Sequence, residues 1–174
     1  MRELRQIAET APLRHAWRQV FRNTDPFTDP FRSSCAAITV LFPTSYTLDR
    51  TQYSAVLSAA AICGDSEFFL SETEWEGDFF DRGRHWIGRD VPYEVYTALG
   101  LTLENALYSP SGQWGVLISH EQHALVAGTA AFVSALRACY PNWRSDVKRL
   151  RERWRNNDRS GWVGPVLARV GDDF

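Results

Sequence analysis

The sequence predicts an α+β fold, with a curved antiparallel sheet of about five or six strands and helices packed mainly on one side. The clearest evidence is the stretch Gln113–Tyr140, in which an alternating apolar run, a polar turn, a second apolar run and a helical pattern follow directly. This order is typical of a β-hairpin that leads into a helix. No internal repeat or low-complexity linker divides the chain, so residues 1–174 are expected to form a single domain.

The first predicted helix begins after Thr10, which can cap it, and carries Pro12 in its first turn, where proline is tolerated. Its apolar face has helical spacing and consists of Leu13, Ala16, Trp17, Val20 and Phe21. Residues 1–9 are expected to extend this helix or to fray.

An extended loop should follow, because the segment NTDPFTDPF contains Asp-Pro-Phe twice. Each proline disfavours helical geometry in the residue before it. We expect Phe27 and Phe31 to hold this loop against the body of the domain.

Short apolar runs rich in β-branched or aromatic residues predict the first strands, at 35–42, 66–73 and 85–88. Helical patterns predict a helix at about 48–63 and a second one with Pro92 in its first turn. Gly64 stands where a left-handed residue commonly ends a helix. The remaining predicted elements are strands at 103–109, 113–119 and 123–127, a helix at 130–140 capped by Thr129, and a helix at about 145–157 capped by Ser145. The tail WVGPVLARV is expected to add an edge strand or to dock as a coil.

Charge and cysteine content predict a cytoplasmic protein. The first 20 residues carry six charged side chains, so no apolar signal core is present, and no uncharged run reaches the roughly 20 residues that span a bilayer. The three cysteines are far apart, and each lies in an apolar segment. This pattern favours reduced, buried thiols over disulfides.

Enzyme motifs are absent from the sequence. It contains no nucleophile elbow, phosphate loop or dinucleotide fingerprint, so we assign no catalytic residue and no cofactor. His120 and His123 are one residue closer together than the two histidines of a zincin helix, and a third ligand would still be needed, so we assign no metal site. The alternative is a small enzyme or metal-binding protein with a site near His85, His120 and His123.

The strongest functional signal is an acidic segment. Residues 65–81 hold seven acids and no Lys or Arg, although the net charge of the whole chain is only −2. Like charges this close repel one another unless a cationic partner is present. Aromatic side chains among such charges can anchor a protein partner. The predicted contact surface for a basic partner, such as a toxin or nuclease domain, consists of Glu72, Glu74, Trp75, Glu76, Asp78 and Asp81.

A second charged segment predicts a different function. Residues 144–159 hold seven bases against three acids, so the predicted helix 145–157 is arginine-rich. Nucleic-acid binding through this helix is therefore a further alternative. We favour a solvated helix face, because Asp146, Glu152 and Asp158 dilute the positive charge and the apolar stripe of the helix is needed for packing.

The chain also resembles a known type of protein. The resemblance rests on the residues Glu104–Pro110, Trp114-Gly115, and His123–Val126 with Gly128 before a helix. They resemble small actinobacterial proteins, some of which are similar to the immunity proteins of polymorphic toxin systems. This resemblance implies a non-enzymatic inhibitor that binds a toxin. Its motif is structural, so it assigns no functional residue.

Overall fold

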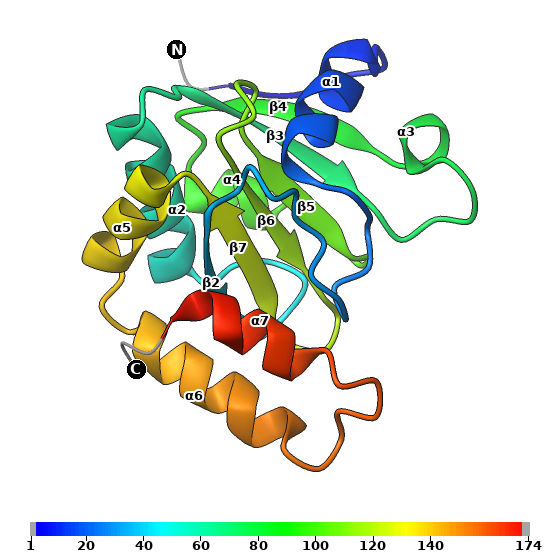
Figure 1. The fold of residues 1–174 in the computed structure, drawn as a ribbon. Helices are drawn as coiled ribbons and strands as arrows, with labels where there is room; N and C mark the ends of the chain where they lie inside the picture. The colour runs from blue at the N-terminus through cyan, green and yellow to red at the C-terminus, as the bar shows by residue number, and fades with distance from the viewer. Residues whose placement is uncertain (1–2, 172–174) are drawn as a thin grey trace.

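The structure is a computed structural model that describes residues 3–171. Its strands form one open antiparallel sheet in the order β1-β4-β3-β5-β6-β7-β2, with helices around it (Figure 1). The α+β class is confirmed, and the sheet has seven strands rather than five or six. The strands are β1 (Glu3–Gln6), β2 (Ala37–Leu41), β3 (Glu67–Glu72), β4 (His85–Arg89), β5 (Asn105–Tyr108), β6 (Trp114–Ile118) and β7 (Ala124–Gly128). The helices are α1 (Ala11–Val20), α2 (Arg50–Ile62), α3 (Phe79–Arg82), α4 (Tyr93–Thr97), α5 (Ala130–Cys139), α6 (Trp143–Trp154) and α7 (Val163–Val170).

The additional strand is β1, which lies in the segment that the sequence predicts to extend the first helix or to fray. It pairs antiparallel with β4, with Leu4 opposite Gly88 and Gln6 opposite Trp86. The prediction fails because β1 is held by the backbone groups at the edge of β4. A strand of four residues, mostly exposed, is also too short to show a clear side-chain periodicity.

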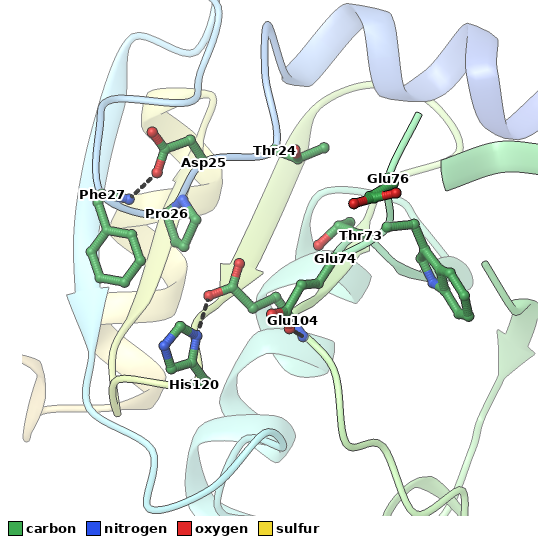
Figure 2. A pocket seen from close by; sticks show the side chains of 10 residues that line it. Thr24, Asp25, Pro26, Phe27, Thr73, Glu74, Glu76, Glu104 and His120 are labelled. Carbon is green, nitrogen blue, oxygen red and sulfur yellow. Dashed lines mark hydrogen bonds and ion pairs between the residues drawn. The ribbon is translucent and has the colours of Figure 1, made fainter. Parts of the chain in front are cut away.

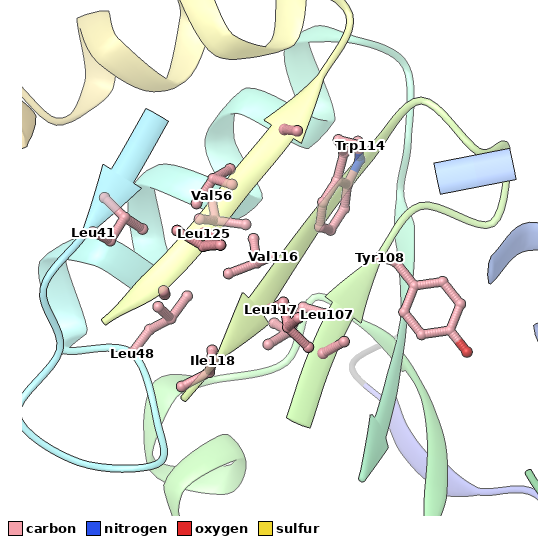
Figure 3. Packing of buried hydrophobic residues seen from close by; sticks show 14 of the residues in the cluster. Leu41, Leu48, Val56, Leu107, Tyr108, Trp114, Val116, Leu117, Ile118 and Leu125 are labelled. Atoms are coloured by element: carbon pink, nitrogen blue, oxygen red, sulfur yellow. The ribbon is translucent and has the colours of Figure 1, made fainter. Parts of the chain in front are cut away.

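The centre of the sheet is buried on both of its faces. Every residue of β5, β6 and β7 is buried, and side chains alternate between the faces along a strand. On one face Trp114 stacks on Phe132 of α5, with the ring centroids 5.1 Å apart. On the opposite face Trp17 of α1 meets the ring of Tyr108 edge to face at 5.5 Å. Figure 3 shows part of this core around β6 and β7.

The sequence predicts helices mainly on one side of the sheet, and the structure also places a helix on the other side. α2 and α5 lie side by side on the Trp114 face (Figure 1), while α1 covers part of the other. Gly115 of β6 makes the packing of α1 on the sheet possible. A Cβ atom at this position would lie 2.6 Å from Val20 and 2.5 Å from the ring of Phe21. The end of α1 thus packs directly on the backbone of the sheet.

The loop between α1 and β2 continues this second cover. It is irregular as predicted, and the side chains of Asp25 and Asp29 accept bonds from the backbone N–H groups of Phe27 and Phe31. Phe31 is buried, with its ring centroid 5.2 Å from that of Phe21. Both phenylalanines of the repeated Asp-Pro-Phe unit hold the loop to the body, which confirms the prediction.

Several local signals act as the sequence predicts. Thr129 accepts a hydrogen bond from the N–H of Phe132 and caps α5 at a distance of 3.2 Å. Gly64 adopts a φ of +93° directly after α2. The three cysteines are free, but only Cys35 is buried, and Cys139 is exposed at the end of α5. None of the helices within residues 3–171 is long and apolar enough to cross a bilayer.

The C-terminal part differs from its prediction in two respects. α6 begins at Trp143 after Asn142, rather than after Ser145, and it ends at Trp154. The tail forms the helix α7 instead of an edge strand or a coil. The carboxylate of Asp158 accepts hydrogen bonds from the N–H groups of Trp162 and Val163, each at 3.0 Å, which satisfies donors at the start of α7.

A buried carboxylate joins α6 to the rest of the fold. Asp146 of α6 is 3% exposed. Its Oδ2 accepts hydrogen bonds from the backbone N–H of Phe42, the side chain of Gln52 and the hydroxyl of Tyr140, at 3.0, 3.1 and 3.0 Å. One side chain thus connects the end of β2, the start of α2 and the segment after α5.

Asp146→Ala should lower the free energy of unfolding by about 3 kcal/mol, because it leaves three buried donors without their shared acceptor. Urea denaturation followed by circular dichroism measures this change. Glu152→Ala on the exposed side of the same helix is the control and should change it by less than about 0.5 kcal/mol. Equal effects of the two substitutions would contradict the connecting role of Asp146.

Candidate functional site

The structure divides the acidic segment into paired carboxylates and unpaired ones. Glu72, the last residue of β3, has a side chain that is 2% exposed and pairs with Arg84, whose Nη2 lies 2.6 Å from Oε1. The Nε atom of Arg84 also contacts both oxygens of this carboxylate. Glu72 therefore lies inside the domain, and its predicted place on a partner surface is wrong.

Asp78 and Asp81 are also occupied by the protein itself. Both form ion pairs with the guanidinium of Arg14 on α1, and the pair with Asp81 measures 2.5 Å. The hydrogen bond from Arg14 holds the pKa of Asp78 below its usual value. Asp78 also accepts a bond from the N–H of Phe80 and so caps α3, a helix that the sequence does not predict. The side chains of these two aspartates are 45% and 68% exposed, so they remain at the surface, but each already has a cationic partner within the chain.

Two other acids of the segment, Glu74 and Glu76, line an open pocket of about 470 Å³. Glu67 instead pairs with Arg89, and Asp65 accepts hydrogen bonds from Ser109, Ser111 and Trp114. One wall is the loop Thr24–Phe27, and the opposite wall is Thr73–Glu76, which follows β3 (Figure 2). Glu104 and His120 complete the lining. The lining holds four carboxylates and no Lys or Arg, and these acids are Asp25, Glu74, Glu76 and Glu104.

A buried glutamate and a histidine are hydrogen-bonded to each other at the inner end of the pocket. Glu104 is 7% exposed, and its Oε1 lies 2.7 Å from Nδ1 of His120 (Figure 2). The hydroxyl of Ser119 donates a second bond to the same oxygen at 3.3 Å. Burial raises the pKa of Glu104 above its usual value, and the hydrogen bond from His120 acts in the opposite direction.

The hairpin register explains why Glu104 and His120 meet. β5 and β6 pair with Asn105 opposite Ile118, so the next positions outward, Glu104 and Ser119, lie at the same end of the ladder. His120 is one residue further along the turn. The sequence predicts the two strands of this hairpin, but the contact between Glu104 and His120 depends on their register, which the apolar pattern alone does not give.

The wall Thr73–Glu76 contacts Glu104 through Glu74 and presents Trp75 at the surface. One carboxylate oxygen of Glu74 accepts a bond from the backbone N–H of Glu104 at 3.2 Å, so its side chain points into the pocket. Trp75 is 41% exposed, which makes it one of the few large apolar side chains on the surface of the described residues. Glu74, Trp75 and Glu76 are thus the part of the predicted contact surface that the pocket retains.

The three histidines of the alternative site do not come together around this pocket. His85 is buried, with Nδ1 2.9 Å from the hydroxyl of Ser71 and Nε2 3.3 Å from the carbonyl of Phe80. His123 is buried beneath the loop and stacks on Trp162 at 4.9 Å. Only His120 lines the pocket.

His123 nevertheless fixes one wall of the pocket. Its Nε2 donates to the carbonyl of Pro26 at 2.9 Å, and its ring contacts the ring of Phe27. Burial lowers the pKa of His123 to about 4, so the imidazole is neutral at pH 7. The loop that carries Asp25 is therefore held in place by an uncharged histidine.

The arginine-rich helix is largely engaged with its own surroundings. Arg149 lies over the ring of Phe42 and 3.7 Å from Asp146, and Arg153 pairs with Glu121 at 2.9 Å. The guanidinium of Arg144 lies over the ring of Trp143. The basic charge of α6 is therefore partly balanced within the domain.

No family model matches the chain, and neither does any curated protein or solved structure. The function therefore has to be inferred from the pocket itself. Sequence reasoning missed two of the four acids of the pocket, Asp25 and Glu104. Asp25 lies 49 residues before Glu74, and Glu104 lies 28 residues after Glu76, so neither belongs to the acidic segment that the sequence singled out. The signal available was an acid within a mostly apolar predicted strand, which is the position of Glu104 in 103–109.

His123, which holds the loop that carries Asp25, makes the stability of the fold depend on pH. Its folded-state pKa of about 4 lies below the unfolded value of about 6.5, so its stabilisation is complete above pH 6.5 and is lost as the pH falls toward 4. Between pH 7.5 and 4.5 the free energy of unfolding should fall in both proteins. We expect this fall to be about 2 to 3 kcal/mol smaller in His123→Gln than in the wild type. Urea unfolding at the two pH values measures the difference. His15→Gln, at an exposed histidine of α1, should behave as the wild type. A parallel loss in wild type and His123→Gln would refute this account.

Proposed function

We propose that this protein is a non-enzymatic binding protein that holds cationic side chains of a basic protein partner in its acidic pocket. The observation that supports this proposal is the pocket lining, which combines four carboxylates, no Lys or Arg, and the exposed ring of Trp75 at one edge. A pocket with one sign of charge focuses its field on a ligand of the opposite sign.

The chemistry of the pocket suits an arginine side chain. A guanidinium can donate two parallel bonds to a carboxylate such as that of Glu76 and can stack its face on an aromatic ring such as Trp75. Asp25 on the opposite wall adds negative charge to the same opening. A lysine fits the charge but not the bidentate and stacking geometry.

The partner that best fits this chemistry is a protein with a basic surface, such as a toxin or a nuclease domain. Nucleases that bind phosphate chains carry exposed arginines and lysines. A compact acidic and aromatic pocket would engage such residues and block the surface that they form. This is the mode of action of an immunity or antitoxin-like inhibitor, and it needs no catalytic residue.

A nona-arginine peptide tests cation recognition by the pocket. Titration calorimetry at low salt should show binding, and the double substitution Glu74→Lys, Glu76→Lys should weaken it at least about tenfold, because like charges would then face each other. Glu94→Lys changes an exposed acid of α4 outside the pocket and is the matched control. Affinity should also fall as the salt concentration rises.

The same variants test the biological partner. A protein captured from the source organism by the wild type should be basic, and its affinity should fall in the double variant and not in Glu94→Lys. Trp75→Ala should lower the affinity for the partner about tenfold, because the ring of Trp75 would no longer stack on a bound guanidinium. Undiminished partner binding by the double variant would overturn the proposal.

A further inference from the structure

The inner end of the pocket contains side chains that commonly bind metal ions. Glu74, Glu104 and His120 each offer one ligand atom, and these atoms all lie within 4.8 Å of one another. Among the described residues, no other group of three or more His, Cys, Asp or Glu side chains is arranged in this way. The three residues come from different parts of the chain: the end of β3, the start of β5 and the turn after β6.

The spacing is close to what a single ion requires. Ligand atoms bound at about 2.1 Å in a tetrahedral site lie about 3.4 Å apart. Oε1 of Glu104 and Nδ1 of His120 are closer than this, at 2.7 Å, so small rotations of Glu74 and His120 would be needed to place the three ligand atoms evenly around an ion. Both side chains have room for this, since Glu74 is exposed and the side chain of His120 is 40% exposed. Glu104 is buried and hydrogen-bonded, so it supplies the fixed ligand.

A separate observation points to a ligand in the same place. Thr73 lines the pocket and is 4% exposed, yet its hydroxyl oxygen is buried and has no hydrogen-bond partner. Figure 2 shows Thr73 on the same wall as Glu74, with this oxygen on the pocket side. Buried polar groups are nearly always hydrogen-bonded, so an unpaired hydroxyl that lines a pocket calls for a partner in that pocket. A water molecule bound to an ion would supply one.

We propose that Glu74, Glu104 and His120 bind one divalent transition-metal ion, with Zn²⁺ as the test ion. The imidazole nitrogen favours a transition metal over Ca²⁺ or Mg²⁺, which prefer oxygen ligands alone. Two carboxylates would balance the charge of the ion. This balance explains why an acidic side chain is kept in the buried position of Glu104.

The site goes beyond the proposed binding of a basic protein and does not depend on it. The ion would occupy the inner end of the pocket and use Glu74 and Glu104. Asp25 and Glu76 nearer the opening would remain for a partner.

Calorimetry with ZnCl₂ tests the site on untagged protein that has been treated with EDTA and dialysed. We expect one ion per chain, and at least tenfold weaker binding in His120→Asn and in Glu104→Gln. Glu94→Gln removes an acidic charge outside the pocket and should bind Zn²⁺ as the wild type does. Mg²⁺ at the same concentration should bind more weakly than Zn²⁺.

Two further measurements keep the test decisive. Circular dichroism confirms that His120→Asn is folded, which we expect because this side chain lies at the surface. Co²⁺ added to the wild type should give visible absorption bands of a protein-bound ion with nitrogen and oxygen ligands, and His120→Asn should lack them. Absence of Zn²⁺ binding in the wild type, or unchanged binding in folded His120→Asn, would overturn the proposal.

Discussion

The fold depends on the burial of the central strands on both faces. β5, β6 and β7 contain no residue that faces solvent, so one layer of helices cannot satisfy the sheet. The α2–α5 layer covers one face, and the chain needs α1 and the loop after it to cover the other. Gly115 allows this second layer to approach closely, because it has no side chain to hold α1 away from the backbone.

The same constraint creates the pocket. The loop after α1 crosses the sheet as part of its cover and is anchored by Phe31 and by the bond from His123 to Pro26. The segment after β3 leaves the sheet on the other side of the opening. Between them lies the end of the β5–β6 ladder that is remote from the hairpin turn, and Glu104 and His120 line the pocket at this end. The pocket is thus the place where the cover of the second face is incomplete.

Local charge density was a poor guide to the surface of this protein. Of the acids between residues 65 and 81, four form ion pairs with arginines of the same chain: Glu67, Glu72, Asp78 and Asp81. Asp65 accepts hydrogen bonds from Ser109, Ser111 and Trp114. Repulsion within the segment is therefore relieved internally and does not by itself require a partner. What remains is a smaller group of carboxylates that gains two members, Asp25 and Glu104, from distant parts of the sequence. The candidate site is defined by this convergence and not by the acidic run.

The sequence by itself determined most elements, because their signals are local. Apolar runs located β2 to β7, Thr129 and Gly64 marked helix ends, and the repeated Asp-Pro-Phe unit excluded a helix from the loop. It also singled out Glu74, Trp75 and Glu76, which line the pocket. Only the tertiary structure decided that β1 joins the sheet edge, that α7 is a helix, and which acids are paired. Those outcomes depend on partners far away along the chain, such as Arg14 for Asp78 and the backbone of β4 for β1, and periodicity within a short segment carries no information about them.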